Sequence, residues 1–194
     1  DGETTGEWTR TFDSIHNDDF GEKVQADSFG NIYTAGEFSY TADFDGTVGV
    51  DSRTPTGEYG DMFLTKYGSG GQYIYTYINS ATGDSSMALA TALTVDSTDN
   101  VFVAGKAFHG TIDLDGTAGS DLHTVGVSGS AFFSKYTSAG SYEWSKAFDG
   151  IIEIRDIAVK NGLGIFLTGY YAGTVDFDPS GGVAARNCDL AILF

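Results

Sequence analysis

The chain has 194 residues, with 27 acidic and 10 basic side chains and a formal net charge of −17. Hydrophobic residues make up 41% and aromatic residues 14% of the sequence, which is too much apolar content for a disordered acidic tail. The negative charge repels phosphate backbones, and the basic residues are scattered, so nucleic acid is not an expected partner. The apolar runs fall far short of the roughly 20 residues that span a bilayer, so no membrane span is expected.

The first predicted element is a strand at residues 7–12, with the sequence Glu-Trp-Thr-Arg-Thr-Phe. It resembles residues 143–148, Glu-Trp-Ser-Lys-Ala-Phe, which form the last strand of a later repeat. Residues 7–12 are therefore predicted to be an orphan last strand, called d, of a four-stranded unit.

Two complete units follow this orphan strand. The segment at residues 31–36, Asn-Ile-Tyr-Thr-Ala-Gly, reappears 69 residues later as Asn-Val-Phe-Val-Ala-Gly. The unit at 20–79 is predicted to have strands a to d around 22–27, 31–39, 61–67 and 72–78. The unit at 85–149 has the equivalent strands around 87–96, 100–109, 131–137 and 141–148, although residues 85–95 are also compatible with the start of a helix.

The last unit, at residues 153–194, is incomplete. Strand a is predicted near 154–160, strand b at 164–171, and strand c begins at Asp189. Short aromatic and β-branched runs bounded by Gly, Asn and Asp are typical of strands joined by hairpin turns.

The predicted fold is all-β, a β-propeller-type array of four-stranded antiparallel blades in a single repeat domain. The chain supplies about three blades' worth of strands, whereas closed propellers typically have about four to eight blades. It should therefore not close a ring alone. Two interpretations stay open: the chain is a fragment of a longer propeller, or several chains exchange d strands.

A family resemblance rests on these repeated strings. They are Asp-Ser-x-Gly-Asn-Ile-Tyr-x-x-Gly-x-Phe at 27–38, Phe-x-x-Lys-Tyr at 63–67, Tyr-x-Trp-x-Lys-x-Phe at 142–148, and Thr-Val-Asp-Phe-Asp-Pro at 174–179. Together they resemble the bacterial SBBP-type β-propeller repeat. The resemblance implies a secreted or surface-exposed repeat protein and implies no activity. The chain departs from the pattern at residues 160–164 and in its long connections between strands b and c, 46–60 and 116–130.

An acidic pair follows each b strand. The pairs are Asp43 and Asp45, Asp113 and Asp115, and Asp176 and Asp178. Alternate residues of a strand point the same way, and carboxylate and carbonyl oxygens are the ligands that Ca²⁺ prefers. We therefore expect Ca²⁺ at one or more pairs, the first two being the better candidates. In the alternative interpretation, the aspartates only cap turns.

No catalytic motif is present. His16, His109 and His123 lie at non-equivalent positions, the single cysteine excludes an internal disulfide, and no G-x-S-x-G elbow occurs. The predicted function is a non-enzymatic, extracellular or cell-surface structural or adhesive module, calcium-stabilised, with protein partners or self-association through strand edges and loops. The alternative is a carbohydrate-active or other hydrolytic enzyme that uses loop acids such as Glu58, Asp61, Asp84 and Asp121. The aromatic residues Trp8, Tyr75 and Trp144, at equivalent d positions, are expected to pack between blades, with carbohydrate stacking as the alternative.

Overall fold

The structure, a computed structural model, describes residues 8–14, 19–178, 180 and 182–193. Every element in these residues is a β-strand or bridge, which confirms the predicted all-β fold class. Residues 85–95, for which a helix was the alternative, contain strand β9 (Met87–Val95). No helix that could cross a membrane occurs in the described residues.

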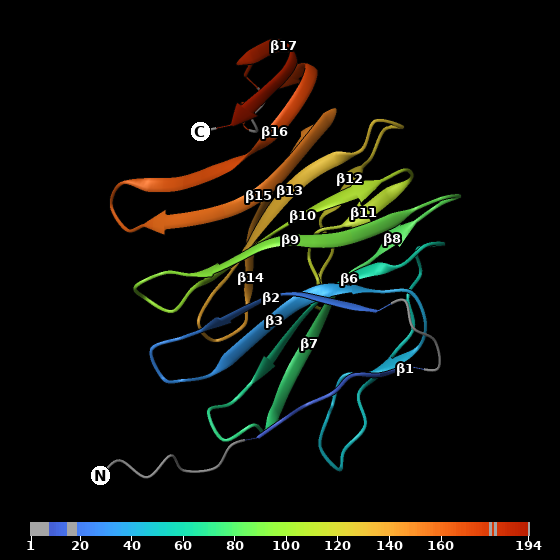
Figure 1. Ribbon diagram of the computed structural model, residues 1–194, viewed down its shortest axis with the longest axis vertical. Coiled ribbons are helices and arrows are strands. Elements are labelled where there is room, and N and C mark those ends of the chain that lie inside the picture. The colour runs from blue at the N-terminus through green and yellow to red at the C-terminus, as the bar shows by residue number, and fades with distance from the viewer. Residues whose placement is uncertain (1–7, 15–18, 179, 181, 194) are drawn as a thin grey trace.

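Three antiparallel sheets are stacked along the long axis of the molecule, as Figure 1 shows. The first has the order β2 (Phe20–Ala26), β3 (Ile32–Phe38), β6 (Asp61–Tyr67), β7 (Tyr73–Asn79). The second has the order β9, β10 (Val101–Phe108), β13 (Ser130–Tyr136), β14 (Tyr142–Asp149). The third has β15 (Ile151–Lys160), β16 (Gly164–Asp176) and β17 (Ala185–Leu193). The strands thus run in the predicted a-b-c-d order, and the array is not closed. The c strand of the third sheet begins four residues before the predicted start at Asp189.

The core lies between the sheets because each sheet has an apolar face that only a neighbouring sheet can cover. Tyr33 and Leu64 of the first sheet pack with Val103 and Phe132 of the second in one buried cluster. On its opposite face, the second sheet packs against Ile152, Ile154 and Ile157 of the third. The predicted packing role of Trp144 is confirmed, because its ring lies 5.7 Å from that of Phe133 in this second cluster.

Two small three-stranded sheets lie beside the large ones. They are β1 (Asp13–Ser14), β4 (Ala42–Asp43) and β5 (Ser52–Arg53), and then β8 (Ala81–Thr82), β11 (Thr111–Asp113) and β12 (Leu122–Thr124). In each one, the long connection between b and c folds back as a hairpin, and the segment after a d strand adds a third strand. The long connections therefore contain regular β-structure.

Residues 8–12 lie against the first sheet as strand β7 lies against the second. The indole N–H of Trp8 donates to the Ser69 carbonyl, and Arg10 Nε donates to the Gly71 carbonyl at 2.8 Å. One unit later, the Tyr77 hydroxyl makes the equivalent bond to the Gly140 carbonyl at 2.6 Å. The segment therefore lies where the d strand of a preceding unit would lie. The predicted strand at 7–12 is not formed in residues 8–12, because no described c strand pairs with them, and residue 7 lies outside the described residues.

Each a strand of the large sheets carries a bulge at the same point. The residues skipped in the pairing are Glu22, Thr91 and Arg155. Each bulge brings a carbonyl oxygen onto a glycine of the neighbouring b strand, Gly36, Gly105 or Gly169. A Cβ at these glycines would lie only 1.8 to 2.5 Å from that oxygen, which explains why the sequence repeats a glycine there.

Candidate functional site

The first acidic pair organises the loop that follows strand β4. Asp43 Oδ1 accepts hydrogen bonds from the backbone N–H of Asp45, at 3.0 Å, and of Asp51, at 2.8 Å. Asp45 Oδ1 accepts from the backbone N–H of Thr47 at 3.0 Å and from its hydroxyl at 2.5 Å. The two carboxylates thus satisfy backbone donors that the loop leaves free.

The second and third pairs repeat this arrangement. Asp113 Oδ1 accepts from the backbone N–H of Asp115 at 3.1 Å and of Asp121 at 2.8 Å. Asp176 Oδ1 accepts from the N–H of Asp178 at 3.0 Å and of Ala184 at 2.8 Å. The same geometry in three loops shows that the motif encodes a loop shape.

A glycine four residues after the second aspartate makes room for its other oxygen. A Cβ built on Gly49, Gly119 or Gly182 would lie 2.0 to 2.1 Å from Oδ2 of Asp45, Asp115 or Asp178. Ca²⁺ requires about six to eight oxygen ligands. Among the described residues, no three His, Cys, Asp or Glu side chains gather in a way that could hold a metal ion. Turn capping accounts for the observed contacts, and calcium binding at the three pairs stays a prediction.

A second set of aspartates shapes the a-b hairpins. Asp96 Oδ1 accepts from the backbone N–H groups of Thr98 and Asn100, at 2.8 and 3.0 Å, and its Oδ2 accepts from the Asn100 side chain. Desolvation alone would raise the pKa of Asp96, but these hydrogen bonds outweigh it and hold the pKa below its usual value. Asp27 caps the first hairpin in the same way. These are structural carboxylates.

The structure contains a repeated Tyr–Asp pair that the sequence patterns did not predict. The Tyr73 hydroxyl donates to Asp51, and the Tyr142 hydroxyl donates to Asp121. Both pairs tie the end of a loop to a d strand. When the two units are aligned at their 69- to 70-residue offset, Asp51 matches Asp121, and this match could have indicated the pair from the sequence. Asp121 is therefore a repeated residue, whereas the enzyme alternative required acids unique to one unit.

Each of the other candidate catalytic groups in the described residues either makes a structural contact or is exposed. Asp61 is fully buried and accepts hydrogen bonds from three backbone N–H groups, so it holds a loop in place. Glu58 accepts a hydrogen bond from the Ser85 backbone N–H, and Asp84 is exposed. His123 pairs with Asp149 at 3.0 Å, and His109 lies in a turn with a φ of 55°. His16 lies outside the described residues.

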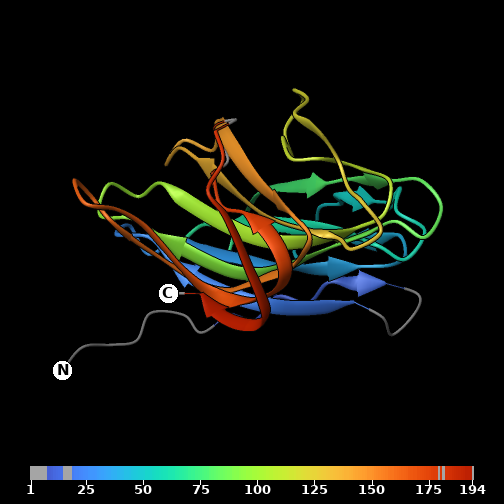
Figure 2. The ribbon, with the colours of Figure 1, turned by 90° about the horizontal axis from the view of Figure 1, so that it is seen from above.

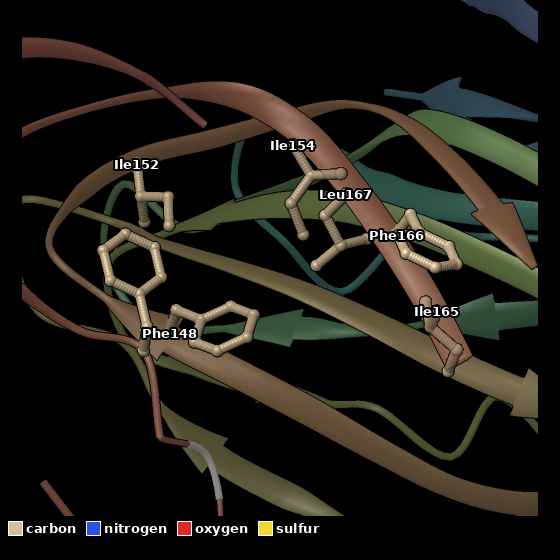
Figure 3. Close-up of a pocket in the computed structure, with 7 residues that line it drawn as sticks. Phe148, Ile152, Ile154, Ile165, Phe166 and Leu167 are labelled. Atoms are coloured by element: carbon tan, nitrogen blue, oxygen red, sulfur yellow. The ribbon is translucent and has the colours of Figure 1, made fainter. Parts of the chain in front are cut away.

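An apolar cavity of 240 Å³ lies between the second and third sheets. Figure 3 shows Phe148 of β14 facing Ile152 and Ile154 of β15 and Leu167 of β16 across it. Strand β17 pairs with β16 only along residues 169–176. On the β17 side, residues 164–168 of β16 therefore have no paired strand among the described residues. In the second sheet, the c-strand residues beyond Phe132, among them the buried Tyr136, occupy the corresponding place.

A curated relative was found by sequence comparison. The chain is 29% identical over 190 residues to an uncharacterized WD repeat-containing protein, L264, of Acanthamoeba polyphaga mimivirus. The match covers 84% of this chain but only 13% of the relative. No family model matches the chain, and no solved structure matches it. WD repeats are four-stranded propeller blades, so the relative agrees with the propeller-type fold described above.

Proposed function

We propose that the chain is a non-enzymatic protein-interaction module built from β-propeller repeats. Stacked antiparallel sheets form a rigid frame, and binding residues on such frames are carried by the connecting loops. The name of the viral relative states a repeat class and no activity. The relative supports the repeat architecture, and the support for binding comes from the loops.

The observation that carries the proposal is the exposure of apolar side chains on capped loops. Val48 and Val50 lie on the loop held by Asp43 and Asp45, and Val50 is 77% exposed. Val183 of the third loop and Val127 after the second hairpin are exposed to a similar degree. Apolar groups held in water by a fixed loop cost free energy unless a partner covers them. We infer that the loops are contact surfaces.

The finer parts of the proposal concern place and role. We propose an extracellular or cell-surface location, with a structural or adhesive role in a surface layer or filament, and self-association through strand edges as one mode of contact. The support is the resemblance to the SBBP-type repeat and the acidic composition. Labelling intact cells with a membrane-impermeant amine reagent tests the location. Labelling only after lysis would exclude it.

A peptide-display selection tests the interaction role. The chain, immobilised, is offered a random peptide library, and we expect recurrent sequences to be enriched. The variant with Val48→Thr and Val50→Thr should lose at least part of this enrichment, since it removes apolar contacts without altering the aspartate caps. The matched control is Val24→Thr, which changes an exposed valine on strand β2. No enrichment, or equal enrichment on the loop variant, would contradict the proposal.

A further inference from the structure

A pocket of 330 Å³ opens between the first two sheets, where strand β3 ends and strand β9 begins. Three partly exposed aromatic rings and a methionine line it, together with two glutamates and a serine: Phe20, Tyr40, Tyr59, Met87, Glu37, Glu58 and Ser39. Figure 1 shows strands β3 and β9, whose ends border the pocket. The pocket combines aromatic surface with two carboxylates.

The pocket has a fixed base. The backbone N–H of Tyr59 donates to the Ser86 carbonyl at 3.0 Å, and the N–H of Ala88 donates to the Gly60 carbonyl at 3.1 Å. Ser39 Oγ donates to the Tyr59 carbonyl at 2.9 Å. The segment that carries Glu58 and Tyr59 is therefore bonded to both sheets, and the pocket exists before any ligand arrives.

Glu37 is the unusual group in this pocket. Its Oε2 atom is out of contact with solvent and has no hydrogen-bond partner among the described residues. Burial, and next the charge of Glu22, raise the pKa of Glu37. A carboxylate oxygen withdrawn from water without a donor costs free energy, and a cation in the pocket would offset that cost.

The second unit shows what completes such a site. Pairing register places Glu37 opposite Phe20 and Lys106 opposite Leu89, so Glu37 and Lys106 are equivalent positions. Lys106 Nζ lies 3.9 Å from Glu153 Oε2 and 4.7 Å from the ring centre of Phe108. The second unit thus holds a cation between a carboxylate and an aromatic ring. In the first unit Glu37 itself stands where the second unit has its lysine, so the residues that line the pocket include carboxylates and aromatic rings but no lysine or arginine.

We propose that this pocket receives an arginine or lysine side chain of a protein partner. Cations bind favourably over aromatic faces and form their strongest hydrogen bonds with carboxylates. A volume of 330 Å³ is at the lower end of the range of about 300 to 1,000 Å³ for ligand pockets, which suits one side chain. The net charge of −17 also attracts a basic partner over long range. The inference rests on the proposed interaction function and names the chemistry of the partner.

The test uses defined peptides with the isotope-labelled chain in solution. The probe is the capped peptide Gly-Gly-Arg-Gly-Gly, and its control carries citrulline, which has the same shape without the charge. We expect saturable NMR shifts at Phe20, Glu37 and Met87 with the arginine peptide, and none with citrulline. Glu37→Gln should weaken binding by about tenfold or more, because a hydrogen bond to a charged group is lost. Added salt should weaken binding as well.

Two controls keep the result specific. Glu143→Gln removes the same charge from strand β14 of the second sheet and should leave binding unchanged. Glu37→Gln should melt no lower than the wild type, because it removes the charge from a half-buried side chain whose Oε2 atom has no hydrogen-bond partner among the described residues. Shifts that also occur with citrulline, or an affinity for the arginine peptide that Glu37→Gln leaves unchanged, would overturn the proposal.

The two proposals fail in different ways. If the display selection enriches peptides equally on the wild type and on Glu37→Gln, the interaction function stands and the basic-side-chain pocket falls. If the arginine peptide binds at Glu37 but no library peptide depends on the loop valines, the pocket stands and the loop surface falls.

Discussion

At the residue scale, the repeated glycine of each b strand is explained by the bulge beside it. A Cβ on Gly105 would lie 2.5 Å from the Leu89 carbonyl oxygen and 2.5 Å from the Phe132 ring. We expect Gly105→Ala to lower the free energy of unfolding by about 2 kcal/mol or more, because the backbone carbonyl cannot move without breaking the pairing of the sheet. Urea denaturation measures this. Gly126→Ala, where nothing lies within 4 Å, should cost far less, and equal losses would show that the clash is relieved.

The hairpin aspartates make stability depend on pH. Asp96→Ala removes the acceptor for two backbone N–H groups and should cost about 1 to 2 kcal/mol at pH 7. The pKa of Asp96 is lowered in the folded chain, so its contribution is present above the unfolded value near 4 and is lost as pH falls through the folded value. The difference between wild type and variant should therefore shrink below about pH 4. A difference that stays constant with pH would show that the ionised form is not what stabilises the turn. Asp84→Ala, at an exposed carboxylate, should show little effect throughout.

At the element scale, residues 8–12 cover part of the first sheet that would otherwise face water. The Phe12 ring centre lies 5.1 Å from the rings of both Phe44 and Phe63, which are buried. We expect Phe12→Ala to cost about 2 kcal/mol, less than a fully buried phenylalanine would, since Phe12 is only partly buried. Hydrogen exchange should accelerate in β4 and β6 more than in β13. Phe29→Ala, 74% exposed at a hairpin tip, is the control, and uniform acceleration across all sheets would contradict a local role.

The strands of the large sheets could be predicted because each strand carries its own signal in a run of alternate aromatic and β-branched residues between turn residues. The small sheets could not, because strands such as Ala42–Asp43 are two residues long and form only through pairing inside the loop and with the segment that follows the preceding d strand. The start of β17 was misplaced for a related reason: its first residues pair with an extension of β16 that resembles a loop in sequence.

The candidate site shows the same division. The acidic pairs were found from their repetition, and they lie in equivalent places: Asp43 and Asp113 end the short strands β4 and β11, and Asp176 ends the long strand β16. That their oxygens bond to backbone N–H groups depends on loop conformation, which the sequence does not specify. Glu37 was missed because its significance lies in a contrast with Lys106, visible only when the two units are paired strand by strand.

At the scale of the whole molecule, stacking of sheets makes stability a sum of units and the contacts between them. In Figure 2, the view from above, the stacked sheets overlie one another. Neighbouring hairpin tips are joined as well: Asp99 accepts hydrogen bonds from Ser28 at 2.8 Å, and Asn161 donates to Ser97 at 2.9 Å. Each unit therefore supports the next one at its core and at its tips.

Repulsion among the negative charges opposes the compact array, and bound Ca²⁺ is predicted to reduce it. We expect millimolar Ca²⁺ to raise the melting temperature and a chelator to lower it. At 100 times its dissociation constant a ligand adds about 2.7 kcal/mol, or roughly 5 to 10 °C for a domain of this size. The variant with Asp113→Asn and Asp115→Asn keeps an oxygen that can accept from the turn N–H groups, so it separates metal binding from capping.

The informative quantity is the shift caused by the chelator, compared between wild type and variant. If the substitutions remove capping, the melting temperature of the variant falls both with Ca²⁺ and with the chelator. If they remove a metal site, the difference between these two melting temperatures becomes smaller than in the wild type. Mg²⁺ at the same ionic strength corrects for screening, because it demands a smaller octahedral site and would not fill a calcium loop equally well. If the chelator leaves the wild-type curve unchanged, the aspartates act as turn caps alone.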